Sequence, residues 1–164
     1  QAHFGKAVTD QDFPGQFQLI TFGYTFCPDV CPTTLVEVAQ ALELLGDRAR
    51  RVQPLFVTID PERDTLKVLR TYVEFFHPRI IGLRGSPELT RRIAEHYKVR
   101  YEKVFAPGVA PEHYAVDHTA GIYLLGTDGA FLSKFAYGAS AREIADRLTA
   151  LIDANPLPPA REGR

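Results

Sequence analysis

Apolar residues along this chain follow two patterns in turn. Short continuous apolar runs, typical of buried strands, cover residues 16–23, 52–60 and 79–84. A segment with apolar residues three and four positions apart follows each run, which is the spacing of one helix face. These segments predict helices over residues 32–45, 66–76 and 87–97.

The last third of the chain has a different order. A strand is predicted over 99–105, and a Pro/Gly-rich loop over 106–115. Strands over 119–125 and 130–137 flank Thr127-Asp128-Gly129, a hairpin signal, and a capping box at Ser140 opens the last helix. Repeated strand and helix followed by a hairpin predicts an α/β fold, with a central mixed sheet flanked by helices in three layers.

The length and composition are those of one ordinary globular domain. With 164 residues, 45% hydrophobic and 24% charged, we expect a single domain over residues 1–154 and a disordered tail over 155–164. The net charge of −1 and the shortness of the basic runs argue against nucleic-acid binding. No apolar stretch has the length of a membrane span, so we expect membrane attachment only through a segment outside this sequence.

The two cysteines are the strongest chemical signal. Cys27 and Cys31 lie between the first predicted strand and its helix, where sites form in open sheets. We expect Pro32 to be the first helical residue, with Cys31 near the N-cap, Cys27 in the loop, and Asp29 capping the helix or tuning the thiols. The positive end of the helix would lower the pKa of both thiols. Such a pair forms a disulfide or binds a soft metal.

Five histidines are candidates for a further ligand. His3, in the irregular start of the chain, and His77, at the end of a predicted helix, are interpreted as surface residues. His96 is interpreted as a residue on a helix surface. His113 lies in the Pro/Gly-rich loop over 106–115, which is long enough to be mobile, and could approach a metal transiently. His118 stands at the entrance to an apolar strand, where it is either a surface or capping residue or a partner of the cysteines across the fold.

A comparison with redox folds favours the second interpretation of His118. Thioredoxin-like proteins carry Cys-x-x-Cys at the first helix and a cis-proline before the later hairpin, facing the cysteines. This chain has Cys-x-x-x-Cys, and His118 occupies the place before the hairpin. If the fold is thioredoxin-like, an imidazole faces both thiols.

Three separated motifs resemble the Sco/SenC family. They are Phe22-Gly23-Tyr24-Thr25 followed by Cys27-Pro28-Asp29-Val30-Cys31-Pro32, then Thr58-Ile59-Asp60-Pro61-Glu62-Arg63-Asp64-Thr65, and Val116-Asp117-His118-Thr119. The resemblance implies a thioredoxin-fold copper chaperone for cytochrome c oxidase assembly, in which Cys27, Cys31 and His118 bind Cu(I), Cu(II) or both. Phe26 departs from some relatives, which have histidine there, and the membrane anchor usual in the family is missing.

The resemblance also implies partners and a location. The expected partner is cytochrome c oxidase subunit II with its dinuclear copper site, alongside other periplasmic copper carriers. The expected location is the bacterial periplasm, with a tether to the inner membrane, or the mitochondrial intermembrane space in a eukaryote. We expect Phe26, Pro28, Val30 and Pro32 to form an apolar docking rim around the thiols.

Several chemical alternatives stay open. Thiolates select Cu(I), and the chain has no methionine to add a thioether ligand. Zinc accepts the same donors, although structural zinc sites usually have four ligands. The pair could instead serve a thiol–disulfide reductase that keeps the oxidase's copper-ligand cysteines reduced, or form an inert disulfide. A peroxiredoxin is disfavoured, because Tyr24 stands where that family's motif needs threonine.

Four acidic and basic residues have two interpretations each. We expect Asp60, Arg63 and Asp64 to form the turn and cap before the second helix, with a surface that binds a partner or supports the site as the alternative. Asp117, next to His118, either orients the imidazole or forms a turn.

Overall fold

The computed structural model describes residues 1–156 and confirms a mixed sheet flanked by helices. Five strands form the main sheet in the order β3-β2-β1-β6-β7. The first three are parallel to one another, whereas β6 is antiparallel to β1 and β7 to β6. The strands are β1 (Phe17–Gly23), β2 (Val52–Thr58), β3 (Ile81–Leu83), β6 (Ile122–Leu125) and β7 (Phe131–Phe135).

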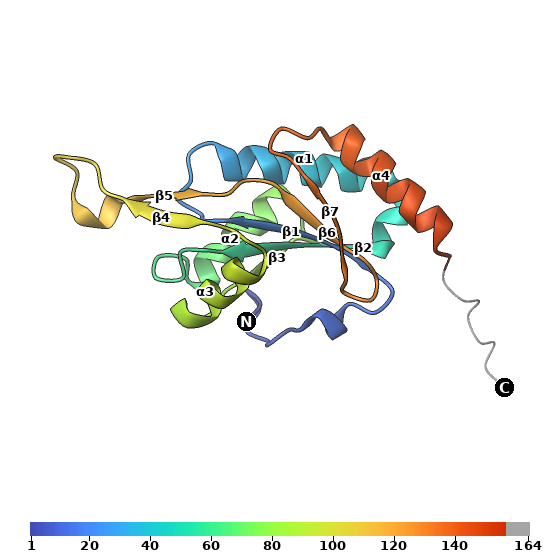
Figure 1. The fold of residues 1–164 in the computed structure, drawn as a ribbon, viewed down its shortest axis with the longest axis horizontal. Coiled ribbons are helices and arrows are strands. Elements are labelled where there is room, and N and C mark those ends of the chain that lie inside the picture. Colours follow the sequence, from blue (N-terminus) through green and yellow to red (C-terminus); the bar gives the residue numbers. More distant parts are fainter. Residues whose placement is uncertain (157–164) are drawn as a thin grey trace.

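The helices cover both faces of this sheet (Figure 1). They are α1 (Val30–Leu45), α2 (Leu66–Phe76), α3 (Pro87–His96) and α4 (Ala141–Ala154), with short 3-10 turns at η1 (Asp10–Asp12), η2 (Gly46–Arg51) and η3 (Pro111–His113). The Phe56 ring lies against Tyr72 of α2, whereas its neighbour Val57 lines a groove with Ile93 of α3. Because successive strand residues point to opposite faces, α2 and α3 lie on opposite sides of the sheet. Helix α1 contacts both α2 and α4.

Strands β1 and β2 form the centre of the core. All seven residues of each strand are buried, as expected for parallel strands covered on both faces. The continuous apolar runs in the sequence therefore predicted these two strands well. The carboxyl end of β1 leads directly into the cysteine loop, residues 24–29, which carries Cys27 and ends at the start of α1.

A two-stranded hairpin extends beyond the main sheet and carries His118 (Figure 1). It consists of β4 (Tyr101–Val104) and β5 (Ala115–His118), paired antiparallel so that Tyr101 lies opposite His118. The sequence predicted β4 but missed β5 and placed His118 before a strand. The reason is that β5 has only four residues, of which Val116 is its sole buried one.

Other sequence predictions are wrong in detail. Helix α1 begins at Val30, two residues before the predicted start at Pro32. The apolar spacing of Leu89, Ile93 and Tyr97 predicted that these three residues form the inner face of α3. The buried residues of α3 are Thr90 and Ala94, and Leu89 is 55% exposed. Ile93 and Tyr97, which were also predicted to face inward, are half-buried and pack against the core.

Both ends of the described chain are more ordered than expected. Ala2 pairs with Leu83, and the Nδ1 atom of His3 accepts the N–H of Gly82 at 3.0 Å, so His3 is bound to β3 and is not a free surface residue. Of the tail predicted over 155–164, Asn155 is the C-cap of α4, and residues 157–164 lie outside the described residues. Within residues 1–156, the helices are too short or too polar to span a membrane.

Candidate metal centre

Three side chains from two distant segments meet at the carboxyl end of β1. The Sγ atoms of Cys27 and Cys31 and one ring nitrogen of His118 all lie within 4.8 Å of one another. The Nε2 atom of His118 is 3.5 Å from the Sγ atom of Cys31. In the described chain this is the sole group of three or more Cys, His, Asp or Glu side chains close enough to share an ion. The structure therefore brings together all three predicted site residues.

The start of α1 places the two thiols differently. Cys31 is in the first turn and is buried, whereas Cys27 precedes the helix and is half-buried; both are free thiols. Pro32 is the third helical residue, which is tolerated because the first four N–H groups of a helix have no partner within it. The proline therefore marked the first turn of the helix rather than its first residue.

Asp29 occupies the N-cap position without capping through its side chain. Within the described chain, its carboxylate accepts no bond from the N–H groups of the helix, and it lies 3.4 Å from the hydroxyl of Thr33. The prediction that Asp29 caps α1 is thus correct in position and wrong in the contact. Its backbone N–H donates to the sulfur of Cys27 instead.

The close packing at Cys31 requires a glycine in β1. A Cβ atom added at Gly23 would lie 2.6 Å from the Sγ atom of Cys31 and 2.9 Å from the ring of Phe56. Real Cβ atoms essentially never approach a neighbour so closely. The glycine at the end of β1 therefore makes the space that the buried thiol occupies.

The two thiols have opposite pKa shifts, contrary to the prediction that both would be lowered. The thiol of Cys31 donates to the sulfur of Cys27, and together with the N–H groups of Cys31 and Asp29 this lowers the pKa of Cys27 to about 5, against the effect of burial. The same hydrogen bond, together with burial, raises the pKa of Cys31. At neutral pH the metal-free pair is therefore one thiolate and one thiol.

The imidazole of His118 is oriented by its neighbours. Its Nδ1 atom lies 3.2 Å from the carbonyl oxygen of Thr119. Because a carbonyl oxygen only accepts, this contact assigns the ring proton to Nδ1 and leaves the lone pair of Nε2 directed at the cysteines. The ring of Tyr24 packs edge-to-face with His118, with centroids 6.1 Å apart.

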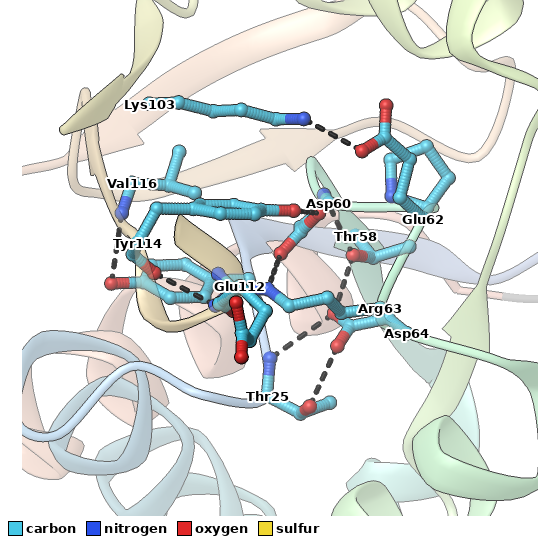
Figure 2. Close-up of polar contacts among 12 residues, drawn as sticks. Thr25, Thr58, Asp60, Glu62, Arg63, Asp64, Lys103, Glu112, Tyr114 and Val116 are labelled. Atoms are coloured by element: carbon cyan, nitrogen blue, oxygen red, sulfur yellow. Dashed lines mark hydrogen bonds and ion pairs between the residues drawn. The ribbon is translucent and has the colours of Figure 1, made fainter. Parts of the chain in front are cut away.

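Asp64 fastens the cysteine loop to the body of the protein. Its buried carboxylate accepts the N–H of Thr25 at 3.1 Å, the hydroxyl of Thr25 at 2.6 Å and the hydroxyl of Thr58 at 2.6 Å. Figure 2 shows these contacts converging on Asp64. The expected turn is present, since the N–H of Asp64 donates to the carbonyl oxygen of Asp60 at 3.0 Å, but the cap of α2 is Thr65. The carboxylate of Asp64 instead holds Thr25, two residues before Cys27.

Asp60 and Arg63 form part of the turn and also contact Tyr114, the residue before the strand that carries His118. The buried carboxylate of Asp60 accepts the Nε–H of Arg63 at 2.5 Å and the hydroxyl of Tyr114 at 2.7 Å (Figure 2). The hydroxyl of Tyr24 accepts the N–H of Val116 at 3.1 Å. Sequence reasoning missed both tyrosines, because each one's partner lies far away in the chain.

The remaining candidates lie apart from the thiols. His113 is exposed in η3, His96 is exposed at the end of α3, and Asp117 is exposed on β5 opposite Glu102. None of the three belongs to the group that could hold an ion. The ring of His118 is oriented by Thr119, not by Asp117.

The donor set fits a soft ion. Metal–ligand bonds of about 2.0–2.3 Å allow two ligands of one ion to lie up to about 4.5 Å apart, close to the separation observed here. Two thiolates favour Cu(I), and copper leads the divalent first-row metals in affinity. A closed zinc site would need a fourth ligand, and no fourth Cys, His, Asp or Glu joins the three among residues 1–156.

Comparisons of the sequence with known proteins all identify Sco proteins as relatives. A sequence profile of the SCO1/SenC family matches residues 1–153. The protein SCO2 homolog, mitochondrial, of Bos taurus is 41% identical over 146 residues, which are 88% of this chain and 54% of that protein. The chain spans about half the length of the curated relatives it matches.

Solved structures give the same result. The structure of Bradyrhizobium japonicum ScoI with copper bound has a TM-score of 0.82 and 40% identity, covering 92% of this chain and 94% of that one. BsSco, described as a member of the Sco family of cytochrome c oxidase assembly proteins with a disulfide switch, has a TM-score of 0.70 and 23% identity over 92% of this chain and 88% of its own. At that identity BsSco supports the thioredoxin-like fold alone.

Proposed function

This chain belongs to the SCO1/SenC family, and we propose that it is a copper-binding metallochaperone that delivers copper to, or matures, the dinuclear copper site of cytochrome c oxidase subunit II. The observation that supports this function is the approach of the ligand atoms of Cys27, Cys31 and His118 to within 4.8 Å. These three residues are the proposed ligands. Copper is the cargo of the protein in this account, and the protein supplies a soft, incomplete set of donors.

The placement of the ligands suits a carrier. Cys31 is buried and lies in a helix, whereas Cys27 is in a half-exposed loop that solvent and a partner can reach. A site with three ligands leaves room for a ligand of the acceptor to enter before one of the carrier's ligands leaves. The copper-bound ScoI of B. japonicum, at 40% identity over almost the whole chain, supports copper as the ion.

The proposed partner surface lies around the thiols. Phe26 is 58% exposed beside Cys27, and Pro28 is also exposed. We propose that this apolar rim, completed by the half-buried Val30 and Pro32, contacts subunit II or another copper carrier of the same compartment. The proposed location is the bacterial periplasm, tethered to the inner membrane, or the mitochondrial intermembrane space, which the mitochondrial SCO2 relative supports.

A second candidate function rests on the unequal thiols. A half-exposed Cys27 with a lowered pKa next to a protonated Cys31 is the arrangement of an attacking and a resolving thiol. In this alternative the pair reduces the copper-ligand cysteines of the oxidase: the acceptor disulfide gains two electrons as Cys27 and Cys31 form a disulfide. His118 has no required part in that exchange.

One experiment separates the two functions. Reduced protein is titrated with Cu(I) without oxygen, and the loaded protein is mixed with the soluble copper domain of an oxidase subunit II. A carrier takes up one copper per chain and passes it on, and a His118→Ala variant binds copper more weakly while keeping thiol–disulfide exchange. Exchange with an oxidised subunit II, without stable uptake of copper, would instead identify a reductase.

A further inference from the structure

The loop from 59 to 65 between β2 and α2 contacts both segments that carry the proposed ligands. One segment is the loop before α1 with Cys27, and the other is the hairpin β4–β5 with His118. Neither segment is joined to the other by nearby sequence. The contacts of this loop therefore act together with the direct bond between Val116 and Tyr24 to hold the two segments close.

Arg63 and Asp60 hold the hairpin. The Nη1 atom of Arg63 donates to the carbonyl oxygen of Tyr114 at 2.7 Å, and the hydroxyl of Tyr114 donates to Asp60 at 2.7 Å. The guanidinium carbon lies 3.6 Å from the centroid of the Tyr114 ring. Figure 2 shows Tyr114 and Arg63 on either side of the Asp60 carboxylate, and burial together with this bond raises the pKa of Tyr114, so that its hydroxyl remains a donor.

Arg63 also reaches the cysteine loop. Its guanidinium carbon lies 4.9 Å from the centroid of the Phe26 ring, immediately before Cys27 in the chain. The Nη2 atom is buried and has no hydrogen-bond partner in the described chain, and the guanidinium lies over the rings of Phe26 and Tyr114. One side chain that is 15% exposed thus contacts both ligand-bearing segments.

The hairpin needs such contacts to stay in place. A two-stranded hairpin alone is at best marginally stable in water. Besides Arg63, the hairpin is attached by the packing of Val116 into the core, by the bond from Val116 to Tyr24 and by the exposed ion pair of Lys103 with Glu62 at 2.7 Å. Exposed ion pairs contribute little, whereas the Arg63–Asp60 pair is largely buried.

We propose that Arg63, held by Asp60, is a positioning residue that keeps the hairpin against the cysteine loop and thereby sets how fast the site releases its metal. This inference rests on the proposed metal-binding role of Cys27, Cys31 and His118. Arg63 touches none of these three ligand atoms in this account. It acts by keeping His118 within reach of both sulfurs.

The test compares Arg63→Gln with Arg79→Gln. Arg79 is a matched control, because it is also half-buried and donates to two backbone carbonyls, those of Ala49 and Val52, but at the opposite end of β2. Both variants lose a guanidinium clamp and should unfold at lower denaturant concentration than the parent. A purely structural role would therefore affect the two variants alike.

Two measurements distinguish positioning from stability. In the metal-free reduced proteins, Arg63→Gln should speed amide hydrogen exchange of Val116 and its hairpin neighbours about tenfold relative to the parent, and Arg79→Gln should leave it within twofold; tenfold corresponds to about 1.4 kcal/mol. In the Cu(I)-loaded proteins, release of copper to a chromogenic chelator should be about tenfold faster for Arg63→Gln alone. Tyr114→Phe, which keeps the ring and loses one hydrogen bond, should change both quantities in the same direction by a smaller factor.

Several outcomes of these measurements would overturn the positioning role of Arg63 or the proposed function. Unchanged exchange and release in Arg63→Gln, or equal changes in Arg63→Gln and Arg79→Gln, would overturn the positioning role. If Arg63→Gln does not fold, Tyr114→Phe carries the same test. If the parent protein holds no copper on the three ligands, the proposed function fails, while the exchange of the metal-free hairpin still decides whether Arg63 positions it.

Discussion

The Nε2 atom of His118 lies 3.5 Å from the Sγ atom of Cys31, although 87 positions separate these residues in the chain. The contact joins the base of the projecting hairpin, where β5 ends, to the first turn of α1. It therefore exists only in the folded protein. A ligand that binds this pair together with Cys27 therefore binds the folded state and stabilises it.

Replacing His118 with alanine should weaken copper binding while leaving the fold intact. The change removes one of three proposed donors but no large part of the core, because the ring is only half-buried. We expect Cu(I) affinity, measured by competition with a chelator, to fall by at least about tenfold, which is about 1.4 kcal/mol. His96→Ala, at an exposed histidine on α3, is the control and should bind as the parent does. Equal affinity of the two variants would remove His118 from the site.

The two thiols should react at different rates with an alkylating agent. Because the pKa of Cys27 is lowered to about 5, this residue in the metal-free reduced protein is a thiolate above that pH and is protonated below it. Its rate of alkylation should stay high from neutral pH down to about pH 6 and decline as the pH falls through about 5. The buried Cys31, with a raised pKa, should react far more slowly at neutral pH. Peptide mapping by mass spectrometry gives both rates, and two equal profiles with midpoints near pH 8.5 would contradict the assignment.

Adding one methyl group at Gly23 should disturb the site from inside the core. The Cβ atom of Gly23→Ala would overlap the sulfur of Cys31 and the Phe56 ring, and overpacking of this kind typically costs about 1–3 kcal/mol. Denaturant unfolding should show this loss together with weaker copper binding. Gly82→Ala is the matched control in the neighbouring part of the sheet, since its nearest contacts would be 3.3 Å. The account of the packing fails if the two variants lose the same stability and bind copper equally.

Oxidation of the cysteine pair should abolish copper uptake. A disulfide between Cys27 and Cys31 removes both thiolates and leaves a single imidazole, which is too few donors for tight binding of Cu(I). The oxidised protein should take up no Cu(I) beyond the background of a double Cys→Ser variant, and reduction should restore one copper per chain. Undiminished uptake by the oxidised protein would place the copper elsewhere.

Much of the fold could be predicted from local sequence. The apolar runs of β1 and β2 are continuous because both strands are buried on both faces. Thr65, Ser86 and Ser140 accept N–H groups at the starts of their helices, which is why the helix starts were clear there. The start of α1 was misplaced because proline is tolerated at any position that lacks an intrahelical partner.

The site was predicted in its ligands but not in its support. Two cysteines four positions apart are a local signal, and the resemblance to a known family supplied His118. The contacts of Tyr114 with Asp60 and Arg63 join residues about fifty positions apart, and no local pattern encodes them. The opposite pKa shifts of the thiols were missed for a related reason, because they depend on which thiol is buried and which donates.

The central claim is that two sulfurs and one imidazole nitrogen of a single chain bind one copper ion. X-ray absorption at the copper K edge of the reduced, Cu(I)-loaded protein tests it most directly. The account predicts two sulfur scatterers and one nitrogen scatterer per copper, with the nitrogen lost or replaced in His118→Ala. A first shell of sulfur alone in the parent protein, or one unchanged by His118→Ala, would contradict it.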